Sequence, residues 1–163
     1  MIENADLTQG DLYPYIIVNT FTKYKDIKMI THSINIETST EAIFAYYKDI
    51  ASWYKWDRDV SEVFLKDGLT IGSTGWLKPK NGPKAHIYIS EVELNKSFTV
   101  ESKLPFCRLI FGHKLEHKGN YTHTTHSAEF VGPLSFIFRR LIGKQIDKTL
   151  PETLLSLKKI CEK

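Results

Sequence analysis

The segment GPLSFIFRRLIGKQIDKTLPETLLSLKKI, residues 132–160, predicts one long helix at the end of the chain. Pro133 suits the first helical position, because the N–H that proline lacks would have no partner there. Pro151 is expected to kink the helix by removing one backbone hydrogen bond. Apolar residues recur at helical spacing and form one broad stripe: Leu134, Ile137, Phe138, Leu141, Ile142, Ile146, Leu150, Leu154, Leu157 and Ile160. So wide an apolar face must be covered by another layer.

Seven segments before this helix predict that layer. They alternate between apolar and polar residues, or run apolar between turn residues, as strands do. The predicted strands are residues 29–36, 60–66, 72–79, 84–93, 97–104, 107–117 and 121–131. Two short helices are expected after the first strand, one capped by Thr38 or Ser39 and one in the aromatic-rich stretch 51–59. The fold class is therefore α+β, with a seven-stranded, curved antiparallel sheet wrapped around the C-terminal helix.

The length of 163 residues suits one domain with one sizeable core. Residues 29–163 carry the whole predicted pattern. Residues 1–28 differ from it, with one short apolar run followed by a polar stretch, and they are predicted to be an N-terminal appendage, poorly ordered or not native to the protein. The sequence therefore predicts a single domain over residues 29–163.

Composition and charge exclude several function classes. The 22 basic and 19 acidic residues give a net charge of only +3, too mild for a nucleic-acid partner. No apolar run is long enough to predict an integral membrane segment. Acidic residues and no basic region precede the first apolar run, so no signal peptide is predicted and a cytoplasmic protein is expected. Cys107 and Cys161 are then expected to be reduced thiols. No glycine pattern for a phosphate or dinucleotide is present, so no cofactor is expected.

Several short stretches together resemble a known superfamily. They are Ile34-Asn35-Ile36, Ala42-Ile43-Phe44, Asp49-Ile50, Trp53-Tyr54-Lys55-Trp56-Asp57, Gly72-Ser73 with Gly75 and Leu77, Lys96-Ser97-Phe98, Val131-Gly132-Pro133-Leu134, Leu141-Ile142-Gly143 and Leu150-Pro151. In this order, over about residues 29–162, they resemble the START-like (Bet v 1-like) superfamily with its helix-grip fold. The match is nearest to the polyketide cyclase/dehydrase (SRPBCC) branch.

The resemblance implies a deep, mostly apolar pocket between helix and sheet that holds a hydrophobic small molecule. Members of the superfamily include lipid carriers, hormone receptors, quinone-binding proteins and a few cyclases. Fold alone does not fix function. The superfamily has no universal catalytic motif that could be placed on residues of this chain.

Four of the six histidines lie in HKLEHKGNYTHTTH, residues 113–126, which predicts a hairpin turning at Gly119. His113 shares its face of the first strand with apolar residues, and His126 does so on the returning strand, so both are expected to point inward and to lie opposite one another. His32 alternates with three isoleucines and is also expected to face inward. In the topology of the superfamily these three histidines lie on adjacent strands. His123 is expected to point outward.

Three interpretations of the inward histidines stay open. They line the cavity and bond to water or to each other, as polar groups in apolar pockets do. They orient a polar ligand head, or act as acid and base on an enolisable substrate, with His113 and His126 as catalytic candidates. They form a three-histidine metal site, which is the least favoured because no helical metal motif supports it. We therefore expect no metal.

The predicted function is binding or carriage of a hydrophobic small molecule, such as a lipid, a quinone or a polyketide-like compound. One alternative is an enzyme of cyclase or dehydratase type that uses the pocket histidines. Another is a protein-interaction module with a filled cavity. The candidate ligand-binding residues are His32, Trp56, Trp76, Tyr88, Phe98, Phe111, His113, His126, Phe130, Ile137 and Leu141. Trp53, Trp56 and Asp57 form either a lid or, as we prefer, packing of the short helices. The oligomeric state stays open.

Overall fold

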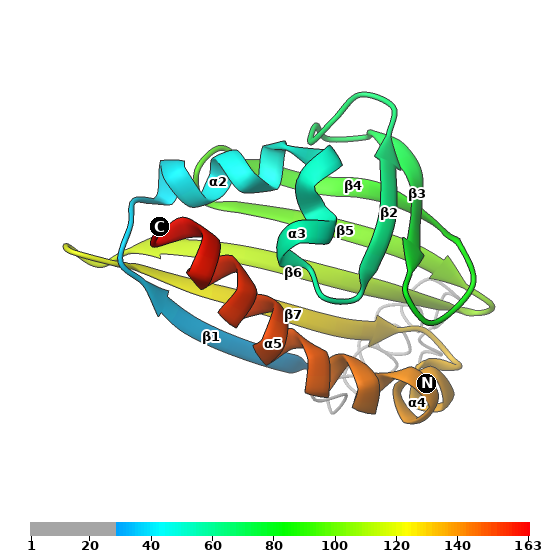
Figure 1. Cartoon of the computed structure of the whole chain (residues 1–163). Helices are drawn as coiled ribbons and strands as arrows, with labels where there is room; N and C mark the ends of the chain where they lie inside the picture. Colours follow the sequence, from blue (N-terminus) through cyan, green and yellow to red (C-terminus); the bar gives the residue numbers. More distant parts are fainter. Residues whose placement is uncertain (1–28) are drawn as a thin grey trace, which may run out of the picture.

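The structure is a computed structural model, and it describes residues 29–163. The predicted appendage, residues 1–28, lies outside the described residues. Figure 1 shows one sheet with helices on one of its faces. The elements in chain order are β1 (Ile30–Ile36), α2 (Thr40–Lys48), the 3₁₀ turn η1 (Ile50–Ser52), α3 (Trp53–Trp56), β2 (Val60–Leu65), β3 (Thr74–Pro79), β4 (Ala85–Glu93), β5 (Ser97–Leu104), β6 (Cys107–His117), β7 (Thr122–Val131), α4 (Ser135–Phe138), the π turn η2 (Arg139–Gly143) and α5 (Lys144–Cys161).

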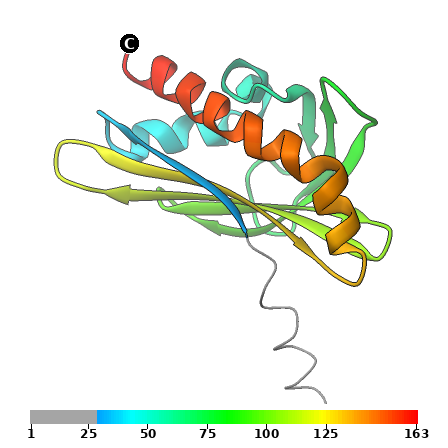
Figure 2. The ribbon, with the colours of Figure 1, turned by 90° about the horizontal axis from the view of Figure 1, so that it is seen from below.

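The sheet has seven antiparallel strands in the order β1-β7-β6-β5-β4-β3-β2. The first strand therefore pairs with the last, and the others follow as a meander. In Figure 2 the sheet curves beneath α5, while α2 and α3 lie on the same side as that helix. The predicted α+β fold, with its seven strands, two short helices and long C-terminal helix, is confirmed.

The register of the last hairpin and the first strand is also as predicted. His126 of β7 lies opposite His32 of β1 on one side and opposite His113 of β6 on the other. The two-residue period puts every second residue of β7 on the helix side. Those residues are all buried: Thr122, Thr124, His126, Ala128 and Phe130. His123 points to the outer face, where its Nδ1 lies 2.8 Å from Asn35 Oδ1.

The short helices are fixed by a cap and by their aromatic residues. Ser39 caps α2, accepting a hydrogen bond at its Oγ from the N–H of Ala42. Trp53 is buried and donates its indole N–H to the carbonyl of Tyr47 at 2.9 Å. Trp56 is buried beside it. Packing, and not an exposed lid, is therefore the role that the structure gives to both tryptophans.

The start of the C-terminal helix departs from the prediction. Residues 139–143 form a π turn, with the i→i+5 hydrogen bonds of that conformation. The extra residue in this turn breaks the single helical period on which the predicted stripe was drawn. Ile137 is consequently 37% exposed and Leu141 is 69% exposed, so neither is an interior residue as predicted. Pro151 lies inside α5, and this helix is continuous from Lys144 to Cys161.

The core has two parts. The larger part joins α2, α3, the C-terminal end of α5 and the adjoining strands. The smaller part contains Ile30, Leu109, Phe130 and Leu150 and lies toward the start of the C-terminal helix. Phe111, in the middle of β6 on the helix side, packs against both parts but is only half-buried.

Candidate functional site

Two of the predicted histidines lie close together between the sheet and the short helices α2 and α3. The imidazole of His113 stacks on the ring of Phe98, with 3.9 Å between ring centroids and 5° between planes. The ring centroids of His113 and His126 are 4.5 Å apart. A hydrogen bond of 2.9 Å joins Tyr47 Oη and His126 Nε2. Trp56 closes the group, since its ring lies near both Tyr47 and His126.

Burial decides the charge of these groups. It lowers the pKa of His113 to about 3. Burial, together with the nearby His113, lowers the pKa of His126 well below its usual value. Burial also raises the pKa of Tyr47 well above 10. Both imidazoles and the phenol are therefore neutral at physiological pH, and they offer hydrogen bonds without charge.

Three buried polar atoms around this group have no hydrogen-bond partner among the described residues: Trp56 Nε1, His113 Nδ1 and Thr124 Oγ1. Trp56 and His113 flank the Tyr47–His126 pair, and Thr124 is the next inward residue of β7. An unpartnered buried polar atom costs on the order of 1–3 kcal/mol, so each of them favours a polar guest. Chemically, this end of the interior can accept a hydroxyl, a carbonyl or a water molecule.

His32 does not join the other two histidines. Its Nε2 lies 2.7 Å from Asp147 Oδ1 of α5, so the imidazole turns toward the helix. The three imidazoles share adjacent strands but do not converge on one point. Among residues 29–163, no group of three histidine, cysteine or carboxylate side chains is arranged to hold a metal ion.

Other apolar residues on the helix side of the sheet are only partly buried. Phe111 lies on a central strand and faces the helix, a position at which an aromatic ring is normally covered. Its partial exposure marks an accessible apolar surface between the two parts of the core. Other half-buried apolar residues that pack, like Phe111, against the smaller part of the core are Leu104, Phe138 and Ile146. Phe98 and Phe130, which were predicted to bind ligand, are fully buried core residues.

Trp76 and Tyr88 do not face the interior, and their predicted facing is wrong. Trp76 lies opposite His86 on the outer face, where it stacks on Phe64 and Lys84 Nζ lies 3.4 Å above its ring. Tyr88 alternates with the buried Ile87 and Ile89, so it too points outward.

Tyr88 belongs to a polar cluster on that outer face. It donates its hydroxyl hydrogen to Glu101, whose carboxylate also pairs with Arg108 at 3.0 Å. The cluster satisfies the tyrosine hydroxyl on the side of the sheet away from α5. It therefore leaves Tyr88 no role inside the fold.

Asp57 has a structural role between the short helices and α5. It accepts hydrogen bonds from the Thr153 hydroxyl at 3.3 Å and from the Asp59 N–H at 3.0 Å. Burial raises its pKa to about 6. Its neighbour Arg58 donates from Nε to Ser156 Oγ at 2.7 Å. These contacts fasten the end of α3 to the helix, which agrees with the packing interpretation of this stretch.

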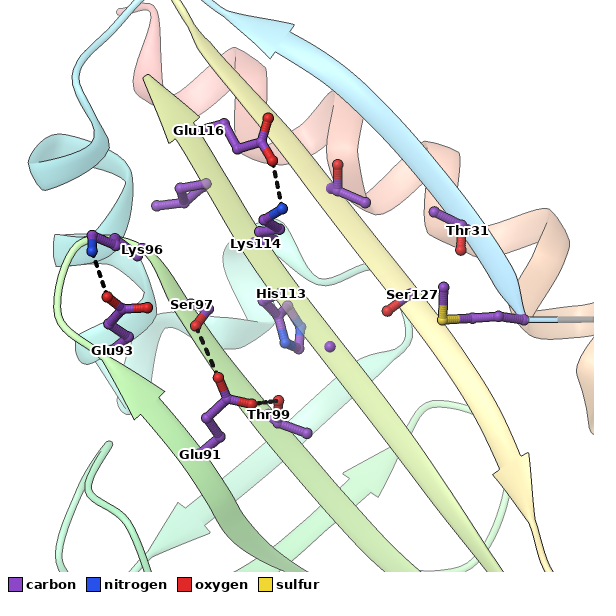
Figure 3. Close-up of a pocket in the computed structure, with 14 residues that line it drawn as sticks. Thr31, Glu91, Glu93, Lys96, Ser97, Thr99, His113, Lys114, Glu116 and Ser127 are labelled. Atoms are coloured by element: carbon purple, nitrogen blue, oxygen red, sulfur yellow. Dashed lines mark hydrogen bonds and ion pairs between the residues drawn. The ribbon is translucent and has the colours of Figure 1, made fainter. Parts of the chain in front are cut away.

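A hollow of about 530 Å³ lies on the outer face of the sheet (Figure 3). Gly112 leaves its centre without a side chain, and serines and threonines of the neighbouring strands surround it. Of its charged residues, Lys114 pairs with Glu116 and Lys96 with Glu93. Glu91 accepts hydrogen bonds from the hydroxyls of Ser97 and Thr99. Sequence analysis missed this hollow, although a glycine flanked across the strands by small polar residues was a usable signal. Its charged and hydroxyl side chains distinguish it from the apolar surface around Phe111.

No model of a known protein family and no curated protein matches the sequence. Solved structures do match the fold. A hypothetical protein from Helicobacter pylori covers 99% of this chain and 98% of its own, at a TM-score of 0.70 and 8% identity. Ara h 8.0201 covers 82% of this chain and 97% of its own, at a TM-score of 0.62 and 10% identity. The chain has the Bet v 1-like fold.

A third match of this Bet v 1-like chain is DynU16, a protein of the dynemicin biosynthetic locus. It covers 80% of this chain and 47% of its own, at a TM-score of 0.59 and 13% identity. The resemblance drawn from the sequence motifs is thereby confirmed at the level of the superfamily fold. Identities this low establish the fold and not the ligand.

The Tyr47–His126 hydrogen bond gives a first prediction. Replacing Tyr47 with phenylalanine is expected to lower the free energy of unfolding by about 1–3 kcal/mol, because it leaves a buried imidazole nitrogen without a partner. Urea denaturation measures the change. Tyr54→Phe is the control, because Tyr54 is half-exposed. Equal stability of the two variants would contradict the role given to the buried pair.

Proposed function

We propose that this Bet v 1-like protein binds a hydrophobic small molecule between the C-terminal helix and the sheet. The observation that carries the proposal is the partial exposure of Phe111. In a sheet whose concave face is completely filled, the central residue beneath the helix would be covered. Here the ring lies between two core clusters and contacts both, and its remaining surface is available to an apolar ligand.

The surroundings of Phe111 fit a ligand with an apolar body and a polar end. Half-buried apolar side chains from β5, α4 and α5 lie beside it, while the three unpartnered polar atoms lie near the Tyr47–His126 pair. Pockets for small molecules combine an apolar lining with a few polar groups that fix orientation. Quinones, fatty acids and aromatic polyketides all have this character. The occurrence of the fold in a protein of the dynemicin biosynthetic locus supports including polyketides.

The acid–base alternative has less support. A general base works best when its pKa lies near the operating pH. Burial lowers the pKa of His113 to about 3 and moves that of His126 in the same direction. Both rings also pack against aromatic neighbours, with only 3.9 Å between the centroids of His113 and Phe98. These groups are therefore better suited to recognising a polar atom than to moving protons.

The proposal is tested by identifying a bound molecule and then weakening its site. Native mass spectrometry followed by denaturing extraction reports any ligand that purifies with the full chain. The purified protein is then titrated with oleic acid, decylubiquinone and an anthraquinone, with thermal shift and tryptophan fluorescence as readouts. We expect at least one of these compounds to bind. An empty protein that responds to none of the three would overturn the proposal.

Phe111→Ala provides the site-specific arm of that test. It is expected to weaken binding about tenfold, equivalent to about 1.4 kcal/mol, because it removes the apolar floor of the site. Phe111→Leu, which keeps more of the apolar volume, should have a smaller effect. Trp76→Ala is the matched control, since this aromatic residue lies on the outer face of the sheet. Equal effects of Phe111→Ala and Trp76→Ala would contradict the proposed location.

A further inference from the structure

The start of the C-terminal helix carries an exposed apolar patch. Phe136 is 67% exposed and Leu141 69%, and Phe106 from the β5–β6 turn is 76% exposed. The carbonyl oxygen of Phe106 accepts a hydrogen bond from the Leu134 N–H at 3.3 Å, so the turn and the helix start lie together. We call this surface the helix-start patch; its members are Phe106, Phe136, Ile137, Leu141 and Ile142.

The helical segment that carries most of the helix-start patch has charge of one sign. No acidic residue occurs in the sequence between Glu129 and Asp147, while Arg139, Arg140 and Lys144 all fall within that interval. None of these three cations forms an ion pair with a residue of the described part, 29–163. The patch is therefore apolar, with unneutralised positive charge on the same helical segment.

The π turn explains why apolar residues are exposed here. It shifts the helical period between α4 and α5, so Leu141 and Ile142 leave the buried face that the residues of α5 continue. Phe138, in the same segment, turns inward and packs on the smaller part of the core. Phe138 therefore holds the segment against the core, while Phe136 lies exposed.

We propose that the helix-start patch docks on the surface of an anionic lipid bilayer. Phenylalanine and leucine side chains next to arginine and lysine, on a helix that is not apolar enough to span a bilayer, are the composition of segments that lie in the membrane interface. The apolar side chains enter the boundary between headgroups and acyl chains, and the cations contact anionic headgroups. None of the described helices is long and apolar enough to cross a membrane, so the contact is peripheral.

The membrane docking proposed here does not depend on the proposed ligand site. Phe138 and Phe111 both pack on the smaller part of the core, so the helix-start patch borders the ligand region without including it. A protein with an empty interior would still dock through the patch. A protein that binds ligand would do so in the absence of lipid vesicles. The two proposals can therefore fail separately.

Vesicle co-sedimentation of the full chain tests the docking. The probes are vesicles of phosphatidylcholine alone and vesicles with about 30% phosphatidylglycerol. We expect binding to the anionic vesicles, weak or no binding to the neutral ones, and a decrease as salt rises from about 0.1 M to about 0.5 M. Absence of binding to the anionic vesicles at the lower salt concentration would overturn the proposal.

Variants separate the apolar and the electrostatic contributions. Phe136→Asp with Leu141→Asp is expected to lower vesicle binding at least about tenfold, and Arg140→Glu with Lys144→Glu to lower it by about the same factor. Ile71→Asp with Leu94→Asp is the matched control, because these apolar residues are equally exposed but lie in turns of the sheet. Phe111→Ala should bind vesicles as the unmodified chain does.

Three outcomes would overturn the inference. One is retained vesicle binding by the Phe136→Asp, Leu141→Asp variant. Another is an equal loss in the Ile71→Asp, Leu94→Asp control. The third is a dimer, seen in sedimentation velocity without lipid, that the patch variant alone abolishes, since the patch would then be a contact between two copies of the chain. Circular dichroism confirms that each variant is folded, and substitution at exposed positions is expected to allow this.

Discussion

Lowering the pH from 7 to 5 is expected to reduce the free energy of unfolding by about 3 kcal/mol. His113 and His126 are neutral in the folded protein because burial lowers the pKa of each ring. Unfolding returns each pKa to 6.5. Below that pH the unfolded chain binds more protons than the native chain, so stability falls as pH falls. At pH 5 the two histidines together account for a loss of about 4 kcal/mol, which the opposite effect of Asp57 reduces to about 3 kcal/mol.

Asp57 works in the opposite direction. Its folded pKa is raised to about 6 from 3.8, so the native state takes up a proton before the unfolded state does. Stability from this group therefore increases as pH falls through 6, and the gain at pH 5 is about 1 kcal/mol. Asp57→Asn should remove that gain and steepen the loss between pH 7 and pH 5 to about 4 kcal/mol.

Urea denaturation at a series of pH values measures both effects. His113→Leu should remove about two thirds of the net acid-induced loss, because one of the two imidazoles is then absent while the opposing effect of Asp57 remains. His123→Gln is the control, since His123 lies on the outer face bonded to Asn35. A pH dependence that is the same in His113→Leu as in the unmodified chain would show that this imidazole is not buried in the neutral form.

Phe98→Ala is expected to lower the free energy of unfolding by about 3–5 kcal/mol. Phe98 is fully buried, and its ring contacts those of His113, Tyr47 and Trp53, with centroid distances of 3.9, 4.9 and 5.8 Å. Removing its ring leaves a cavity between the rings of His113, Tyr47 and Trp53. Those rings cannot fill the cavity without leaving their own positions.

Urea denaturation at pH 7 measures this second large effect. Phe64→Ala, which removes a half-exposed phenylalanine from the outer face, should cost much less. If Phe98→Ala lowered the free energy of unfolding by less than about 1 kcal/mol, the rings around Phe98 would not be packed as their distances indicate.

Much of the fold could be predicted because each strand carries its own two-residue period. The alternation around Gly119 was enough to place His113 opposite His126, and the isoleucines of β1 were enough to turn His32 to the same face of the sheet. Burial of one face then fixes the register, because a slip by one residue would turn every buried side chain outward. Pairing of the first and last strands came from the resemblance and not from the periodicity.

The errors arose where the period was ambiguous or broken. Trp76 and Leu77 are adjacent and both apolar, and the alternation alone does not say which one faces the helix. For Tyr88 the signal was present, since the flanking Ile87 and Ile89 already define the inward face. Leu141 could not be placed correctly, because nothing in a list of apolar positions reveals a π turn. The hydrogen bond between Tyr47 and His126 could not be predicted, because it depends on how α2 packs on the sheet.

The pairing of β1 with β7 also governs when the protein can fold. Ser33 of β1 bonds to Thr125 of β7 across 92 positions of sequence. On the ribosome the first strand therefore emerges long before β7, its neighbour in the sheet among residues 29–163, which is complete only when translation is nearly finished. Contacts between such distant positions slow folding, since a long loop must close before any stabilisation is gained. Chaperones that shield exposed strand edges are expected to act on this chain chiefly before β7 has been synthesised and has paired with β1.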